Sequence, residues 1–345
     1  MRNNHEPLVT KGVPGERALI QRIRSRMGSK SFAGLTLGIG DDCALLAPKP
    51  GELIAVTTDL SIAGRHFKLD WHPPQVVGHR TLARGLSDLA AMGARPLAAF
   101  LSLGLPRELT KQKGRRSAWI DAFFEGFLAL AEANNTPLAG GDLAESPLVV
   151  ADIVLLGAVP RRRALLRSGA RAGDLLYATG ALGGAAAGLV QLDELAARSR
   201  KRAGPPNVPK SMQGPLAAHL YPQPRIAQGL WLQRRGLATA AIDLSDGLST
   251  DLTHLCEESG VAAEIDAGAV PVDTGASFEQ ALHGGEDYEL LFAAPAKARI
   301  PNEIAGVAVS RIGRLLPRHS GRAPITLVNN GREQALEPQG WQHFS

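Results

Sequence analysis

The feature that most constrains this chain is a set of acidic turns placed where apolar segments end. The clearest is the stretch 241–251, where two apolar residues lead to Asp243, Ser245 and Asp246 and a glycine then turns the chain toward a helical pattern. Carboxylates with a hydroxyl between them are hard oxygen ligands, which suit Mg²⁺. The same residue types also form ordinary turns, so this stretch alone leaves both interpretations open.

Four further segments repeat the theme, each beside a strand-like or helix-like run. They are 40–42, 57–59, 87–88 and 140–142. The chain carries a net charge of +5, so an acidic composition does not explain five acidic turns. Divalent cations that hold a polyphosphate would explain them. The sequence therefore predicts a metal-dependent site for a polyphosphate.

Length and composition indicate two domains of the α/β class. A chain of 345 residues with 44% hydrophobic residues can form two ordinary cores, and only 5% of the residues are aromatic. The two cysteines, Cys43 and Cys256, are too few for a disulfide framework or a multi-cysteine zinc site. We interpret both as structural residues.

The sequence favours a cytoplasmic protein that binds neither membranes nor nucleic acid. It contains no signal-peptide pattern and no apolar run long enough to span a membrane. The pI of about 9.4 fits anionic metabolites as well as nucleic acid. The basic residues are not interleaved with the aromatic residues expected of a single-strand groove, and no zinc-finger spacing is present. Small anionic ligands are therefore the expected partners.

The first half, residues 1–160, alternates strand-like and helix-like runs, which is typical of an α/β layer domain. We expect helices at 16–27, 75–92 and 119–134, and strands at 53–58, 96–105, 136–141 and 148–159. The expected helix 75–92 carries Asp88 in an apolar segment, where a buried unpaired carboxylate would be unfavourable. Asp88 is therefore expected to be exposed or bound to something positive.

The second half, residues 161–345, is predicted to be another α/β domain. The glycine-rich turn 180–184 connects an expected strand to an expected helix, but no Lys-Ser or Lys-Thr pair follows it, so it is not a Walker A loop. Its backbone N–H groups could hold an anion. The segment 196–212 is rich in Arg, Lys, Pro and Gly, and it is interpreted as a surface loop.

Ten motifs, each weak alone, together resemble the thiamine-monophosphate kinase family and occur in that family's order over nearly the whole chain. They are GIGDDCALL at 38–46, TTD at 57–59, AGRHF at 63–67, LSDLAAMGARP at 86–96, GGD at 140–142, RALLRSGARAGD at 163–174, YPQPR at 221–225, AIDLSDGLSTDL at 241–252, GGEDYELLF at 284–292 and GWQHF at 340–344. The resemblance implies the two-domain fold shared with aminoimidazole ribonucleotide synthetase. It also implies a homodimer formed through the N-terminal domains, and a nucleotide bound between domains.

The resemblance further implies ATP-dependent phosphorylation of thiamine monophosphate to thiamine diphosphate, by direct in-line transfer assisted by several Mg²⁺ ions. The implied metal ligands are Asp42, Thr57, Thr58, Asp59, Asp88, Asp142, Asp243 and Asp246. The implied nucleotide contacts are Gly141, Asp142, Arg167 and Ser245. The implied thiamine-phosphate contacts are His66, Glu286 and Trp341. Asp246 and Arg167 are the residues expected to carry catalysis.

The chain departs from the family pattern at three places. Gly85 stands where the family usually has Asn, Leu143 follows the Gly-Gly-Asp turn instead of Thr or Ser, and 133–135 lacks a common aromatic residue. Two alternatives therefore stay open: an enzyme of the same fold with another acceptor, and a catalytically weakened nucleotide-binding protein. Selenophosphate synthetase is disfavoured, since no reactive cysteine precedes Gly38.

Overall fold

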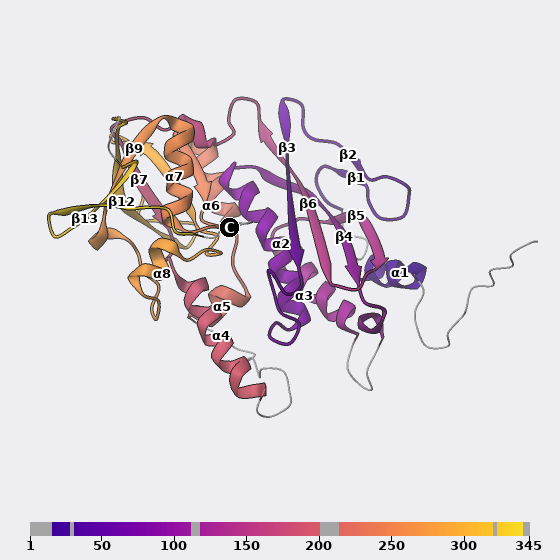
Figure 1. The fold of residues 1–345 in the computed structure, drawn as a ribbon. Coiled ribbons are helices and arrows are strands. Elements are labelled where there is room, and N and C mark those ends of the chain that lie inside the picture. The colour runs from indigo at the N-terminus through magenta and orange to yellow at the C-terminus, as the bar shows by residue number, and fades with distance from the viewer. Residues whose placement is uncertain (1–15, 28–30, 112–117, 201–213, 320–322, 341–345) are drawn as a thin grey trace, which may run out of the picture.

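The computed structural model describes residues 16–27, 31–111, 118–200, 214–319 and 323–340. Two sheets of unequal size lie on opposite sides of the molecule, and helix α2 lies between them (Figure 1). No helix among these residues is long and apolar enough to cross a membrane.

The first sheet is built entirely from residues 52–160. The elements of this half are α1 (Glu16–Met27), β1 (Leu35–Leu37), β2 (Leu45–Leu46), β3 (Glu52–Ile62), α2 (Pro74–Ala91), β4 (Arg95–Leu105), the 3₁₀ turn η1 (Arg107–Thr110), α3 (Trp119–Ala133), β5 (Leu138–Glu145) and β6 (Val150–Pro160). The strand order is β3-β6-β4-β5. Within this four-stranded sheet, β4 and β5 are the pair that runs in parallel, because α3 carries the chain back to the end of the sheet at which β4 begins.

Helices α2 and α3 cover one face of this sheet. Helix α2 begins with Pro74 at its first turn, where the missing N–H has no helical partner to lose. It is buried around most of its circumference, because it packs on the sheet, on α3 and on the second half of the chain. Helix α3 contributes Phe123 and Phe127, which are fully buried. The core therefore holds α2 firmly, and α2 carries Asp88.

The second sheet is built from residues 174–335. The elements are η2 (Arg167–Gly169), β7 (Asp174–Thr179), α4 (Gly184–Arg200), α5 (Pro215–Leu220), α6 (Ile226–Arg235), β8 (Ala240–Asp243), α7 (Leu248–Ser259), β9 (Val261–Asp266), η3 (Ala267–Ala269), α8 (Phe278–His283), β10 (Leu290–Pro295), β11 (Glu303–Ile304), β12 (Val307–Pro317), β13 (Ile325–Asn329) and β14 (Arg332–Ala335). The order is β14-β13-β9-β12-β7-β10-β8, with β11 paired to β12. Strand β8, which ends at Asp243, is the edge next to α2.

The two halves meet where α2 packs against α6 and β8. A Cβ atom on Gly229 of α6 would lie 2.0 Å from the carbonyl oxygen of Ala90, so only glycine lets these helix backbones approach so closely. This contact lies at the last turn of α2, which also carries Asp88, and the same helix packs on β8. Asp88 and Asp243, which are far apart in sequence, are thereby brought to the same junction.

Two predicted segments differ from the observed elements. Asp59 and the Gly140–Asp142 turn were expected at strand ends, yet β3 continues to Ile62 and β5 to Glu145. Both strands continue because their backbones stay paired with β6 and β4, so polar side chains are tolerated on the sheet surface. The expected loop 196–212 is also wrong at its start, since α4 continues to Arg200, and residues 201–213 lie outside the described part.

Candidate active site

The junction of α2, β3 and β8 gathers carboxylates from both halves. The Ser87 hydroxyl donates a hydrogen bond of 2.6 Å to Oδ2 of Asp243, and the Thr57 hydroxyl donates to Oδ2 of Asp88. Ser87 and Asp88 are neighbours on α2, so one turn of this helix contacts the first sheet on one side and the second sheet on the other. We name Thr57, Asp59, Asp88, Asp243 and Asp246 the cleft cluster.

Arg84 balances part of the negative charge of the cleft cluster. Its Nε lies 3.3 Å from Oδ1 of Asp59, one helical turn before Asp88. The pKa of Asp59 is nevertheless raised, first by burial and then by the Asp88 carboxylate. Sequence reasoning missed Arg84, because its partner lies on a strand and no local pattern links the two.

The pKa values of Asp88 and Asp243 at the junction are also raised, so their ionised forms are disfavoured. Burial raises the pKa of Asp88, and burial followed by the charge of Asp88 raises that of Asp243. Asp243 is only 3% exposed. Like charges gathered in a low-dielectric site repel each other and favour protonation. The junction is therefore electrostatically unfavourable unless additional positive charge balances these carboxylates.

Asp246 and Asp251 extend the cluster around the start of α7. Oδ2 of Asp251 accepts hydrogen bonds of 3.0 Å from the backbone N–H groups of Asp246 and Gly247, which fixes the turn between β8 and α7. Burial, then Asp243 and Asp246, raises the pKa of Asp251 to about 8. Asp251 received no role from the sequence, although its position in the first turn of a helix is a familiar signal for such a contact.

Arg167 lies beside the cleft cluster. It is exposed at the start of η2. Burial raises the pKa of Asp88 and of Asp243, and the positive charge of the Arg167 guanidinium offsets part of that rise. The backbone carbonyl of Arg167 accepts a hydrogen bond of 2.5 Å from the Ser259 hydroxyl at the end of α7. A positive side chain is therefore anchored near the carboxylates and open to solvent, where an anionic ligand can reach it.

The donor set of the cleft cluster fits Mg²⁺. It consists of carboxylates and the Thr57 hydroxyl, and a divalent cation would relieve the repulsion that raises their pKa values. Within the described residues, no three His, Cys, Asp or Glu side chains are close enough to hold a metal by themselves. Mg²⁺ is commonly bound by one or two carboxylates, with waters and substrate phosphates completing its shell. The arrangement suits a metal that arrives with a phosphate.

Three other expected site residues lie in a different place. Asp42, Gly141 and Asp142 line a cavity of about 580 Å³ on the first sheet, next to Ile39 and Phe100. Both aspartates are exposed. We name this the sheet cavity. The structure thus divides the expected metal ligands between the cleft cluster and the sheet cavity.

Thr58 belongs on the sheet face opposite to the cleft cluster. Side chains alternate along β3, so the half-buried Thr57 and Asp59 face α2 while Thr58 is exposed on the other side. The three consecutive residues 57–59 therefore do not converge on one point. The side chain of Thr58 would approach a metal ion from the opposite face of β3 to the side chains of Thr57 and Asp59.

The expected thiamine-phosphate residues lie in separate segments. His66 is half-buried after β3, and its Nδ1 accepts a hydrogen bond of 3.1 Å from the N–H of Ile62. Glu286 is half-buried in the turn before β10 and forms an ion pair of 2.6 Å with Arg80. Trp341 lies outside the described residues. The preceding Gly340 donates to Thr250 Oγ1 at 3.0 Å, so Gly340 lies at the start of α7.

The turn that carries Glu286 is hydrogen-bonded through its backbone to residues 244–245, which include the expected nucleotide contact Ser245. The N–H of Glu286 donates 2.8 Å to the carbonyl of Ser245, and the N–H of Tyr288 donates 2.9 Å to that of Leu244. Ser245 itself is half-buried between Asp243 and Asp246. The expected substrate turn and the expected metal and nucleotide residues are therefore adjacent.

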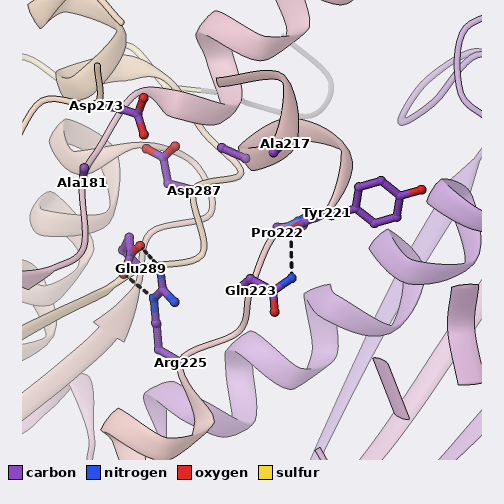
Figure 2. Close-up of a pocket in the computed structure, with 10 residues that line it drawn as sticks. Ala181, Ala217, Tyr221, Pro222, Gln223, Arg225, Asp273, Asp287 and Glu289 are labelled. Carbon is purple, nitrogen blue, oxygen red and sulfur yellow. Dashed lines mark hydrogen bonds and ion pairs between the residues drawn. The ribbon is translucent and has the colours of Figure 1, made fainter. Parts of the chain in front are cut away.

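The glycine-rich turn 180–184 holds an anion, but the anion belongs to the chain. Asp287 accepts hydrogen bonds of 2.7 and 3.0 Å from the N–H groups of Gly183 and Ala185. Asp287 and Glu289 line a cavity of about 470 Å³, in which Arg225 is paired with Glu289 (Figure 2). This cavity contains none of the expected site residues, and its charge is mainly negative. A phosphate-binding role for the turn is therefore unsupported.

Two of the departures from the family pattern have structural consequences. A Cβ on Gly85 would lie 2.5 Å from a methyl carbon of Leu155, so a side chain there requires Leu155 to move. Leu143 is half-buried and packs against the core of the first half. Neither position contributes a carboxylate to the cleft cluster.

Comparison with known proteins shows the family. The chain matches the domains described as AIR synthase related protein, N-terminal domain, over residues 40–159, and C-terminal domain, over residues 171–325. It is 37% identical over 343 residues to the thiamine-monophosphate kinase of Salmonella typhimurium, covering 96% of this chain and 98% of that protein. The chain belongs to the thiamine-monophosphate kinase family.

Solved structures of the thiamine-monophosphate kinase family share the fold. The enzyme from Stenotrophomonas maltophilia K279a superposes with a TM-score of 0.74 at 35% identity, covering 93% of this chain and 98% of that one. AaThiL complexed with AMPPCP and TMP gives a TM-score of 0.69 at 29% identity, covering 96% and 97%. The predicted two-domain fold and the predicted enzyme class, a thiamine-phosphate kinase, are thereby confirmed.

Proposed function

We propose that the chain transfers the γ-phosphoryl group of ATP to thiamine monophosphate, yielding thiamine diphosphate and ADP. The observation that carries the proposal is the cleft cluster, where Asp88 of the first half and Asp243 of the second are joined through Ser87. Family relatives with that activity and the complex of AaThiL with AMPPCP and TMP support both substrates. AMPPCP is an analogue of ATP, so ATP is the expected phosphate donor.

The chemistry of direct transfer fits these side chains. A phosphate oxygen of thiamine monophosphate attacks the γ-phosphorus, and the bond to the bridging oxygen breaks as ADP leaves. The second pKa of a phosphate monoester is about 6, so the nucleophile is already largely ionised at pH 7 and needs no strong general base. The barrier is repulsion between anions, which positive charge and alignment reduce. Arg167 is the cation that reaches the cleft cluster from solvent.

Mg²⁺, when bound, would neutralise phosphate charge and align the reacting oxygens. The residues proposed to hold it in the cleft are Thr57, Asp59, Asp88, Asp243 and Asp246. Asp42, Thr58 and Asp142 are proposed to hold further Mg²⁺ ions from the sheet side. Asp251 has a different role, since it orients the backbone that carries Asp246.

The nucleotide and the thiamine end are assigned to different edges of the site. Gly141, Asp142, Arg167 and Ser245 are proposed to contact ATP. His66, Glu286 and Trp341 are proposed to contact thiamine monophosphate. Trp341 could stack on the cationic thiazolium, a contact worth ~0.5–2 kcal/mol.

A homodimer through the first sheet is also proposed. The face of β3 that points away from α2 exposes Ile54, Val56 and Leu60, with 41%, 61% and 46% of their surface accessible. These three large apolar side chains share one face of β3, with Thr58 between Val56 and Leu60, and exposed apolar side chains grouped in this way suit a surface that a second copy covers. Sedimentation of the wild-type chain and of Val56→Asp tests this. Dimers that dissociate in the variant are expected, and a monomeric wild type would contradict the proposal.

The function is tested by incubating the protein with ATP, Mg²⁺ and a panel of acceptors. The panel contains thiamine monophosphate, thiamine and aminoimidazole ribonucleotide precursors, and the products are separated chromatographically. Thiamine diphosphate and ADP in equal amounts, lost in EDTA, are expected. Transfer only to another acceptor would favour a different enzyme of this fold, and ATP binding without any transfer would favour the weakened nucleotide-binding protein.

A further inference from the structure

The turn before β10 is held in a backbone conformation that requires external support. Glu286 has φ = +67° and Tyr288 has φ = +52°, both in the left-handed region that side chains other than glycine rarely adopt. Each such residue is in an unfavourable conformation and persists only where surrounding contacts fix it. The turn carries Glu286 and its backbone is hydrogen-bonded to the carbonyl of Ser245, so its shape sets where the Glu286 side chain lies relative to the end of β8.

Arg80 of α2 supplies that support from the other half of the chain. Its guanidinium donates 2.6 Å to Oε1 of Glu286 and also donates to the backbone carbonyl of His219 at the end of α5. Arg80 is only 6% exposed. A buried guanidinium is strongly unfavourable without partners. Both partners come from the second half, so this network forms only when the halves are docked.

The ion pair with Arg80 changes the charge and the carboxylate oxygen that Glu286 can present to a ligand. Burial alone would raise the pKa of Glu286, but Arg80 and then His219 outweigh it and lower that pKa to about 2. Oε1 is engaged by Arg80, while 31% of the side chain stays accessible. Glu286 therefore presents one oriented carboxylate oxygen to the site, and its charge is already largely balanced.

A pair of buried histidines completes the second side of this carboxylate. Nε2 of His72 lies 3.2 Å from Nε2 of His219, and Nδ1 of His219 lies 3.9 Å from Oε2 of Glu286. Burial, followed by the charge of Arg80, lowers the pKa of both rings, so both are neutral at pH 7. One proton must then lie between the two Nε2 atoms.

The groups around His72 leave both placements of that proton open. Nδ1 of His72 lies 3.2 Å from both the N–H and the carbonyl oxygen of Lys68, so it can either accept or donate there. If Nδ1 of His219 carries a proton, it turns this N–H toward the Glu286 carboxylate, whereas a lone pair there would be repelled by it. Arg80 is thus the positive partner of Glu286, and the neutral His219 ring lies on its other side.

We propose that Arg80 is a positioning residue that fixes Glu286 and its turn across the junction of the two halves, with the His72–His219 pair supporting the same carboxylate. This inference rests on the proposed function, because it assigns the thiamine-phosphate side of that site. It predicts that Arg80 governs binding of the thiamine substrate and not of ATP. It adds a residue that the family resemblance did not assign.

The test compares Arg80→Gln, Arg80→Lys, Glu286→Gln and the double variant Arg80→Gln/Glu286→Gln with the wild type. The matched control is Arg95→Gln, which removes another arginine–glutamate pair, the one to Glu52, away from the turn. Arg80→Gln should raise the KM for thiamine monophosphate ~tenfold or more and change the KM for ATP by less than about twofold. Arg80→Lys keeps the charge but not the two-acceptor fork, so it should give an intermediate KM.

The double variant separates positioning from general stability. If Arg80 acts through Glu286, the double variant should be within about twofold of Glu286→Gln alone. Two results would overturn the proposal. One is a double variant whose rise in the KM for thiamine monophosphate equals the product of the two single rises, and the other is an equal rise in the KM for ATP and for thiamine monophosphate in Arg80→Gln. If Arg80→Gln does not fold, Arg80→Lys carries the same comparison, because it retains the buried positive charge.

Hydrogen exchange distinguishes failure of this inference from failure of the proposed function. The amides of Glu286 and Tyr288 should exchange faster in Arg80→Gln than in the wild type or Arg95→Gln, whether or not the wild type makes thiamine diphosphate. Unchanged exchange would overturn the positioning role. An inactive wild type with faster exchange in Arg80→Gln would overturn only the proposed reaction.

Discussion

The cleft cluster and the sheet cavity both gather aspartates, but they hold them differently. In the cleft, Asp243 is buried, bonded to Ser87, and has a pKa raised by burial and by Asp88. In the sheet cavity, Asp42 and Asp142 are exposed to water. Solvated carboxylates cost a fold little, whereas buried neighbouring ones are unfavourable unless a cation is present. The buried carboxylates of the cleft cluster therefore lower the stability of the fold in the absence of a cation, which indicates that they are retained for function.

The largest effect is expected at the cleft. Asp246→Asn should reduce turnover by about a thousandfold or more, because it removes a carboxylate proposed to hold the Mg²⁺ that would neutralise the reacting phosphates, while the fold is kept. Thiamine diphosphate formation and circular dichroism measure the two quantities. Asp193→Asn, on the exposed face of α4, is the control. Near-normal activity of Asp246→Asn would show that the metal assignment in 241–251 is wrong.

An intermediate effect is expected at the tail. Trp341→Ala should raise the KM for thiamine monophosphate roughly 2- to 30-fold, which corresponds to the ~0.5–2 kcal/mol of a cation–π contact. The KM for ATP should stay unchanged. Steady-state kinetics with each substrate varied in turn checks this. An equal change in both constants would assign the tail a structural role.

A smaller effect is expected at the sheet cavity. Asp142→Asn should raise the KM for ATP by up to about fivefold, since an exposed charge contributes ~0–1 kcal/mol. Measuring that KM at several Mg²⁺ concentrations shows whether added metal compensates. A loss as large as that of Asp246→Asn would remove the distinction between the two regions.

The smallest expected effect is a difference in how stability depends on pH. The pKa of Asp251 is raised from 3.8 to about 8 and that of Asp243 is also raised, so the folded state binds protons more tightly than the unfolded state. Their stabilising contribution is full below about pH 4 and is lost as pH rises toward 8. In EDTA, the gain in Tm caused by Asp243→Asn should therefore grow from pH 5 to pH 8.

Asp142→Asn, which changes an exposed aspartate, is the control for the pH experiment, because it removes a carboxylate without relieving any burial. Differential scanning calorimetry in EDTA gives both series, and Mg²⁺ with ATP should reduce the gain seen in Asp243→Asn. A pH-independent difference for Asp243→Asn would contradict the raised pKa.

The sequence predicted regular elements well and long-range partners poorly. The expected helix 16–27 matches α1 at both ends, and the expected helix 119–134 ends one residue past the end of α3, because helical periodicity is a local property. The lengths of β3 and β5 were missed, since pairing with β6 and β4 carries them past the polar residues. The acidic motifs were recognised from sequence, but their division between the cleft cluster and the sheet cavity depends on how α2, β3 and β8 pack together, since Asp42 and Asp142 lie elsewhere on the first sheet.

Arg80 illustrates the part of the site that local patterns do not reveal. Its partner Glu286 is separated from it by 206 positions, and an arginine within an apolar helix is equally consistent with an exposed side chain. The glycine-rich turn illustrates the opposite error. It has the composition of an anion site, yet Asp287 supplies the anion.

The central claim is that Asp88 and Asp243 form one reaction centre shared by the two halves. A double-mutant cycle with Asp88→Asn and Asp243→Asn, measured as the single-turnover rate of thiamine diphosphate formation, tests it most directly. Each single variant should lose about a hundredfold or more, and the double variant should be within a few-fold of the slower single one. Losses that multiply, or a single variant with the wild-type rate, would contradict a shared centre.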